Sequence, residues 1–371
     1  MMIIMFLPKK GMLLWPIALL LLALGSCEQP DEDPKPSPNA NPNDSGTTDD
    51  ALSFWVLNEG QFQRANASLG RYDAEARQYK ERLFTEANGN SLGDILQSAR
   101  FGQGRLFICM NNSRRIWVVD TGNSQAIRSM EQVPYPQAFE PLNMEKGYAT
   151  DLYKSYLYVL DWQQGLLLDS IDLKSPAWPM ARKGKYLFVG LRPVSLGTPI
   201  PEEESNAIAI IDTETDEMIK KVPVFAYPAQ TLIGPEGDLW VGCSGQSPQL
   251  GDEKPAGIVH MESAPPFKVL SRWEMPDAGL SSFQYSPEQE LFYWQRKGKV
   301  YRSKLTSTNI PTAPYQTPQE VVTFAGFGIL PDGGIIVGDA LDYVQPGKVY
   351  HYDKGGNLVH SFTAGVIPKA F

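Results

Sequence analysis

Few side chains in this sequence could carry out metal, thiol or acid–base chemistry. The 371 residues include only three histidines and three cysteines. His260, His351 and His360 fall on predicted strands with no further ligand at metal-binding spacing, so we interpret them as structural. The run Glu202–Glu204 could bind a cation, but contiguous carboxylates rarely surround one ion, which favours a solvated loop. Sequence motifs of hydrolases, zinc proteases and nucleotide-binding proteins are absent, and we predict no catalytic residue, metal or cofactor.

Ligand binding is the chemistry that the sequence favours. Aromatic, amide and a few charged side chains recur where predicted strands end, and together they would form a wide, mostly uncharged surface for a flat organic ligand. The alternative is that each aromatic ring packs between structural repeats. The candidate ligand-binding residues are Asn58, Glu59, Phe62, Asn111, Asn112, Tyr135, Trp178, Arg192, Tyr227, Trp294, Phe327 and Asp339.

A repeating strand pattern would position these side chains. A predicted strand that ends in Asp or an equivalent residue recurs seven times, at intervals of 41 to 51 residues. The clearest copies are residues 116–120, 208–212 and 349–353, each followed by a tight turn. Seven copies at this period predict an all-β, seven-bladed β-propeller. Cys109 and Cys243 occupy equivalent positions three blades apart, too far for a disulfide, and are interpreted as buried small apolar residues.

Each copy also contains a hairpin that precedes this strand. Short turns such as 234–238 and 330–334 join two β-rich runs, which is the signature of a hairpin and predicts four strands in each blade. The last six residues, 366–371, resemble the start of an innermost strand at 134–139, whereas the first folded segment resembles a second strand. We therefore expect the C-terminus to supply the inner strand of the N-terminal blade, which would remove two exposed sheet edges.

Long loops predict which face of the propeller binds the ligand. Connections from second to third strands lie on the same face as the connections between blades, and loops longer than a turn requires often carry function. Four are long, namely Asn58–Ser68, Arg192–Asn206, Ser244–Gly257 and Asp339–Gly347.

The N-terminal region has the features of an export signal. Lys9 and Lys10 precede an apolar run from Met12 to Leu24, which has the length of a signal-peptide core. The sequence Leu24-Gly25-Ser26-Cys27 resembles the lipobox of bacterial lipoproteins, and we predict lipidation at Cys27. The alternative is an ordinary signal peptide with a chance cysteine. The expected organisation is a signal peptide (1–26), a disordered acidic tether (27–52) and the propeller (53–371).

Charge gives two further expectations. The formal net charge of −9 leaves no basic stripe for phosphate backbones, so nucleic acid is not an expected partner. The acidic residues Glu28, Asp31, Glu32 and Asp33 resemble the signal that directs lipoproteins of Bacteroidota to the outside of the outer membrane. The alternative is a solvated linker that the same charge keeps extended.

The chain resembles the YncE-like, seven-bladed propeller lipoproteins of Bacteroidota over residues 53–371. The resemblance is carried by Val56–Gly60 with Asn66–Ser68, by Ile210–Thr215 and by Gly365–Pro368. It implies a lipid-anchored protein at the surface of the outer membrane that binds a small organic ligand. In one branch of these proteins the ligand is cobalamin, which is passed to the TonB-dependent transporter for vitamin B12. Haem, iron or glycan binding would use the same architecture.

Two classes of function follow from the sequence. The preferred class is a non-catalytic binding protein, because no general-base pair or metal cluster is evident. The alternative is a propeller hydrolase or lactonase with a metal in the central channel. This class requires several inward-facing metal ligands from the inner strands, and the predicted inner strands contain few of them.

Overall fold

The computed structural model describes residues 53–193, 200–201, 204–250, 252–306 and 309–370. The predicted signal peptide, the tether and Cys27 lie outside these residues. Within them, no helix is both long and apolar enough to cross a membrane.

The chain folds into seven antiparallel sheets, which we number as blades 1 to 7. From the inside outward, blade 1 contains β27 (Pro368–Ala370), β1 (Ser53–Asn58), β2 (Ser68–Asp73) and β3 (Gln78–Lys80). Blade 2 contains β4 (Leu96–Gly102), β5 (Arg105–Met110), β6 (Arg115–Asp120) and β7 (Ala126–Met130). Blade 3 contains β8 (Pro136–Pro141), β9 (Lys146–Asp151), β10 (Tyr156–Asp161) and β11 (Leu166–Asp172).

The remaining blades follow in the same order. Blade 4 contains β12 (Ala177–Lys183), β13 (Tyr186–Leu191), β14 (Ala207–Asp212) and β15 (Glu217–Pro223). Blade 5 contains β16 (Pro228–Ile233), β17 (Leu239–Cys243), β18 (Gly257–Met261) and β19 (Val269–Glu274). Blade 6 contains β20 (Leu280–Ser286), β21 (Leu291–Arg296) and β22 (Lys299–Ser303). Blade 7 contains β23 (Phe324–Ile329), β24 (Ile335–Asp339), β25 (Lys348–Tyr352) and β26 (Leu358–Thr363).

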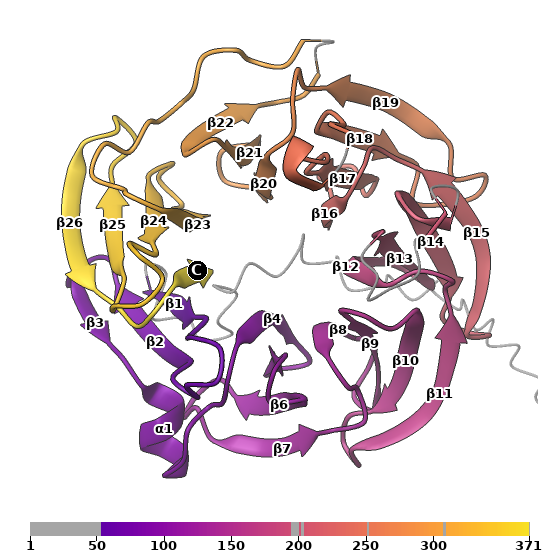
Figure 1. Ribbon diagram of the computed structural model, residues 1–371, viewed down its shortest axis with the longest axis horizontal. Helices are drawn as coiled ribbons and strands as arrows, with labels where there is room; N and C mark the ends of the chain where they lie inside the picture. Colours follow the sequence, from indigo (N-terminus) through magenta and orange to yellow (C-terminus); the bar gives the residue numbers. More distant parts are fainter. Residues whose placement is uncertain (1–52, 194–199, 202–203, 251, 307–308, 371) are drawn as a thin grey trace, which may run out of the picture. The chain divides into compact units, whose positions relative to one another are not determined.

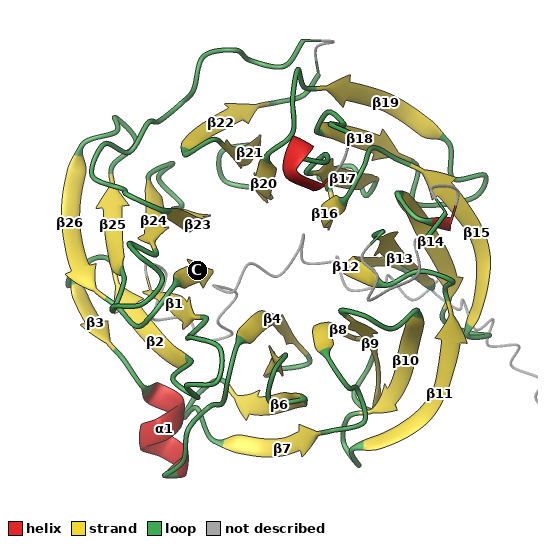
Figure 2. Ribbon diagram, viewed as in Figure 1, coloured by secondary structure: helices red, strands yellow, loops and turns green. Residues whose placement is uncertain are grey.

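These sheets surround a common axis, with one strand of each blade innermost (Figure 1). The arrangement is a seven-bladed β-propeller, as the repeat predicted. Short helical segments, α1 (Leu83–Asn88) and the turn at Pro248–Leu250, lie between strands (Figure 2).

Closure of the ring confirms the expectation drawn from the chain ends. Strand β27 pairs antiparallel with β1, so the last strand completes the first blade. The junction continues beyond the strands, because the Glu59 and Gly60 N–H groups donate to the carbonyls of Ile367 (2.9 Å) and Val366 (3.0 Å). Neither the first nor the last blade is left with an open inner edge.

Blade 6 departs from the predicted four strands. Its three strands are followed by residues 304–306 and 309–323, which form no named strand, and Gln316 alone among them makes an isolated bridge, to Val300 of β22. The outermost position of this blade therefore holds loop instead of strand (Figure 2).

The hydrophobic core lies between neighbouring blades. The second strand β5 (RLFICM) has five consecutive buried residues, because its two faces are covered by the blades on either side. The outermost strand β11 (LLLDSID) instead exposes Leu166, Leu167 and Leu168. Burial in these two strands therefore falls from the second position of a blade to its outer edge.

Candidate functional site

One face of the propeller carries the long loops, and we call it the loop face. The segments that join β1 to β2, β13 to β14, β17 to β18 and β24 to β25 are the four long loops that the sequence predicted. Parts of the second and third of these lie outside the described residues. The backbone ties this face together, because the residue after a second strand donates its N–H to the turn that enters the inner strand. Examples are Asn111 to Ile95, Leu152 to Tyr135 and Ser244 to Tyr227, each at 2.9 Å.

Every inner strand contains an extra residue near its loop-face end. The pairing of inner with second strands shifts register once in each of the seven blades. In blade 3, for example, Pro136 pairs with Asp151 and Ala138 with Thr150, which leaves Gln137 as the bulged residue. Bulges redirect side chains and are frequent at barrel rims and beside functional sites. The seven bulges therefore form a ring of redirected side chains around the axis, close to the loop face.

Three of the predicted ligand-binding residues meet at this ring. The Arg192 guanidinium lies 5.3 Å from the ring centre of Trp178 and 5.8 Å from that of Tyr227. Trp178 belongs to the bulge of β12, Arg192 follows β13, and Tyr227 precedes β16 in the next blade. We call these three residues the arginine cluster.

The local backbone explains why these three side chains converge. Gly190 has no side chain, and a Cβ atom there would lie 2.8 Å from Pro179 Cδ and 3.2 Å from Pro228 Cβ, so glycine lets the bulge and blade 5 approach. Tyr227 has a φ of 53°, which is unfavourable for a side chain of its size, and its N–H donates to Asn206 Oδ1 (3.0 Å). Strain held by a specific hydrogen bond often marks a functional site.

Arg192 is the electrostatic feature of this cluster. Burial lowers the pKa of its guanidinium, and no ion pair with a carboxylate is found among the described residues. Its Nε atom is buried and has no hydrogen-bond partner in this part of the chain. The aromatic rings offset part of the lost hydration through cation–π contacts. A guanidinium without a carboxylate partner in the described chain has the charge and the planar donors that pair with anionic groups.

Other predicted residues on the loop face already pair with neighbouring protein groups. Glu59 forms an ion pair with Lys369 (Oε2 to Nζ, 2.7 Å), and Asn112 Nδ2 donates to Asp94 Oδ2. Asn111 Nδ2 donates to the carbonyl of Pro136 at 3.4 Å. These three contacts stabilise the loops. The ion pair between Glu59 and Lys369 also places two opposite charges at the rim.

Tyr135 and Phe62 make no contact that we describe with the arginine cluster. Tyr135 packs edge-to-face on Tyr153, with ring centres 5.0 Å apart, and the Arg114 guanidinium lies 5.3 Å from its ring. Phe62 projects from the first long loop with 64% of its surface exposed. Both are available to a large ligand or to a partner of the loop face.

Four predicted residues have structural environments instead of the expected ligand-facing ones. Asn58 and Asp339 are fully buried, and Asp339 accepts backbone N–H bonds from Val322 (3.0 Å), Thr323 (2.7 Å) and Leu341 (2.9 Å). Asn58 Nδ2 donates to Ser68 Oγ at 3.0 Å. The aromatic pair Trp294 and Phe327 belongs to hydrophobic clusters, with 1% and 2% exposure. We leave these four out of the candidate site.

The residues considered for chemistry have structural partners. His260 Nε2 lies 3.0 Å from Asp238 Oδ2, and His351 Nδ1 lies 3.2 Å from Tyr72 Oη. Cys109 and Cys243 are free and buried, as the sequence suggested. Among the described residues, no three His, Cys, Asp or Glu side chains come close enough to hold a metal ion.

Sequence reasoning missed Gln137 and Lys369 on the inner strands, whereas Gln230 was among the polar residues expected beside the aromatic rings. The Oε1 atoms of Gln137 and Gln230 are buried without a hydrogen-bond partner in the described chain, and Lys369 is the bulged residue of β27. A signal was present, because Pro136, Pro228 and Pro368 each open an inner strand and the bulge follows directly. Proline lacks the N–H that a regular ladder would use, which favours an irregular pairing at this point.

Fold and site together define the class: a seven-bladed β-propeller with an aromatic and arginine-bearing rim on its loop face. A family model described as a domain of unknown function (DUF5074) matches residues 53–329, and the chain belongs to this family. A search of curated proteins gave no match.

Solved structures with this fold are similar at low sequence identity. A putative 6-phosphogluconolactonase from Bacteroides fragilis is 13% identical, with a TM-score of 0.61 over 88% of this chain and 98% of that one. A functionally unknown protein from Desulfotomaculum acetoxidans is 8% identical, with a TM-score of 0.62 over 85% and 96%. A quinoprotein alcohol dehydrogenase-like protein from Bacteroides thetaiotaomicron is 13% identical, with a TM-score of 0.56 over 86% and 77%. These identities establish the shared fold alone.

Proposed function

We propose that this chain is a non-catalytic binding protein that captures an organic ligand on its loop face. The ligand carries an anionic group and a flat, largely apolar body. The observation that supports this proposal is Arg192, a desolvated guanidinium without a carboxylate partner in the described chain, set between the rings of Trp178 and Tyr227. The anion would pair with the guanidinium, and the flat body would pack on the aromatic side chains.

Cobalamin or another corrinoid is the first ligand to test. A corrinoid combines a flat macrocycle, amide side chains and, in cobalamin, a phosphodiester. The phosphodiester suits the Arg192 guanidinium, and the macrocycle suits the rings of Trp178 and Tyr227. The sequence resemblance to cobalamin-capturing propellers supports the same choice.

The proposed setting is the surface of the outer membrane. Cys27 after an apolar segment supports a lipid anchor, and the acidic residues that follow support export to the cell surface. In this proposal the loaded loop face docks on a TonB-dependent transporter, and exposed Phe62 contributes to that contact. Haem or a glycan remains the alternative cargo within the same architecture.

The test is a titration of the chain from residue 51, which contains every described strand, with cyanocobalamin. Isothermal titration calorimetry gives the affinity, and co-elution of the red chromophore in gel filtration gives a second readout. We expect Arg192→Ala to weaken binding about tenfold or more, because one charge-assisted contact contributes about 1.5–3 kcal/mol. Arg128→Ala, which makes the same change on exposed β7, should leave the affinity unchanged.

Two results would overturn this proposal. A colourless protein peak at micromolar cyanocobalamin rejects the corrinoid. If haem and organic phosphates then also fail to bind, or bind Arg192→Ala as tightly as the wild type, the loop-face anion site is rejected as well.

A metal-dependent lactonase is the second candidate function. It is suggested by the structural similarity to a putative 6-phosphogluconolactonase over most of both chains. A phosphorylated lactone would also offer an anion to Arg192. This candidate predicts lactone hydrolysis that a chelator abolishes, whereas the binding proposal predicts no turnover.

A further inference from the structure

A groove runs along the flank of the propeller between blades 5 and 6. Its volume is about 740 Å³, within the range of small-molecule sites. Pro235, Glu236 and Glu290 belong to hairpin turns that join first to second strands, so this end of the groove lies away from the loop face. The groove is therefore separate from the arginine cluster.

The irregular edge of blade 6 explains why the groove exists. Lys304, Leu305 and Thr306 line it, and they follow β22 where the other blades place a fourth strand. The side of blade 5 that faces this position thus remains partly uncovered. The groove is a consequence of the one blade with three strands.

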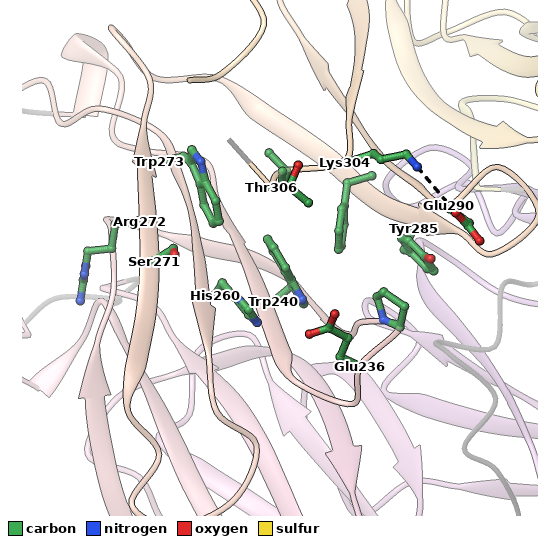
Figure 3. Close-up of a pocket in the computed structure, with 13 residues that line it drawn as sticks. Glu236, Trp240, His260, Ser271, Arg272, Trp273, Tyr285, Glu290, Lys304 and Thr306 are labelled. Carbon is green, nitrogen blue, oxygen red and sulfur yellow. Dashed lines mark ion pairs between the residues drawn. The ribbon is translucent and has the colours of Figure 1, made fainter. Parts of the chain in front are cut away.

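Aromatic side chains form the floor of the groove. Trp240 stacks on His260 with ring centres 4.0 Å apart, and Trp273 lies nearly parallel to Trp240 at 5.5 Å. Tyr285 (Figure 3) and Phe292 complete the floor from blade 6, with their ring centres 4.9 Å apart. Such a floor attracts flat apolar groups and, through the negative faces of the rings, cations.

The charges at the rim favour a cation. Glu236 has no ion pair or hydrogen bond with any described residue, and its carboxylate points toward the groove (Figure 3). Glu290 has Lys304 as its neighbour at 3.7 Å, a long and exposed ion pair. The Arg272 side chain is directed away, because its guanidinium donates to the carbonyl of Pro223 at 2.6 Å. Among the described residues, the Glu236 carboxylate is therefore left unpaired at the rim.

We propose that this groove binds an organic cation, namely an amine or quaternary ammonium attached to an aromatic or aliphatic body. The body packs on Trp273, Tyr285 and Phe292, and the cationic head lies beside the Glu236 carboxylate. Burial and the carboxylates of Glu290 and Glu288 raise the pKa of Tyr285, consistent with an acidic rim. The charge complementarity selects a cation over a neutral molecule of the same shape.

The test compares two probes by isothermal titration calorimetry, with tryptophan fluorescence as a second signal. Benzyltrimethylammonium is the cationic probe, and benzyl alcohol is the neutral one. We expect the cation to bind at least about fivefold more tightly. Glu236→Gln should weaken the cation about threefold and leave the neutral probe unchanged, because the exposed carboxylate attracts only the charged probe. Lys304→Met should strengthen the cation, because it frees Glu290.

Matched controls separate this groove from other acidic surfaces. Glu217→Gln makes the same change on the exposed strand β15 and should leave both probes unaffected. Arg192→Ala should also leave the cation affinity unchanged, which separates this inference from the loop-face function. No binding at millimolar cation, equal affinity for the two probes, or an unaffected Glu236→Gln variant would each overturn the proposal.

Discussion

Glu59 and Lys369 form an ion pair of 2.7 Å across the seam where the two ends of the propeller meet. Glu59 follows β1, and Lys369 is the bulged residue of β27. Burial lowers the pKa of Lys369, and the nearby Glu59 carboxylate opposes that shift. Closure of the ring buries the Lys369 ammonium group, and the ion pair with Glu59 offsets part of the hydration that this group loses.

Removing Glu59 should therefore weaken the seam. We expect Glu59→Gln to lower the free energy of unfolding by about 1–2 kcal/mol, because the lysine loses its compensating charge. Urea denaturation followed by circular dichroism measures this change. Lys369→Met in the Glu59→Gln background should recover most of the loss. A double variant that is less stable than Glu59→Gln alone would contradict the assigned role.

Gly326 gives a steric test of the same closure. A Cβ atom on this residue of β23 would overlap the carbonyl of Lys369, so the last strand could not seat without a shift. We expect Gly326→Ala to lower the free energy of unfolding by about 1–3 kcal/mol, the range for overpacked interiors. Gly122→Ala is the control, since its nearest contact is the Asp120 side chain at 3.3 Å. Equal thermal stability of the two variants would contradict this prediction, because it would show that β27 can shift without loss of stability.

The overall ring and its closure could be predicted from the sequence because both depend on local patterns. Buried second strands are continuous apolar runs, turns are short, and the end of the chain repeats an inner-strand motif. The irregular edge of blade 6 was not predictable in this way. Residues 299–303 satisfy the strand pattern, and nothing local indicates that the described residues 304–306 and 309–323 lack the strand expected next.

The candidate site could be predicted only in part, because residue type alone does not show which way a side chain points. Residue type located Trp178, Arg192 and Tyr227, because an arginine and aromatics beside prolines at blade junctions are unusual. Residue type failed for Trp294, whose ring is enclosed by blades 6 and 5, and for Asp339, whose carboxylate caps backbone N–H groups. The two faces of a blade look alike in sequence, so a polar or aromatic residue at a strand end does not reveal which way it points.

The contact between blades 1 and 7 predicts a pH dependence of stability. Burial is the main cause that lowers the pKa of His351, whose Nδ1 lies 3.2 Å from Tyr72 Oη. Asp332 and Asp353 oppose this shift, whereas Arg77 and His360 add to it. Burial raises the pKa of Tyr72 to about 12, so its hydroxyl stays protonated and shares a hydrogen bond with neutral His351.

The sign of this dependence follows from proton binding. Below the ordinary histidine pKa of about 6.5, the unfolded chain binds a proton that folded His351 does not. The free energy of unfolding should therefore fall as the pH falls from 7.5 to 5.5. Urea denaturation at these two values measures the loss, which we expect to be smaller in His351→Gln. An identical loss in His351→Gln would assign the effect to other groups.

Arginines 192 and 100 should respond oppositely to the same substitution. Arg100 Nε lies 3.0 Å from the buried carboxylate of Glu140, so Arg100→Met strands a charge and should lower the free energy of unfolding by about 2–4 kcal/mol. Arg192 has no such partner in the described chain, and its burial opposes folding. Arg192→Met should therefore leave stability unchanged or raise it by about 1 kcal/mol, while ligand binding is lost. Urea denaturation and calorimetry on the two variants measure both effects. A large loss of stability in Arg192→Met would mean that this arginine holds the fold, and the anion site would then have no support.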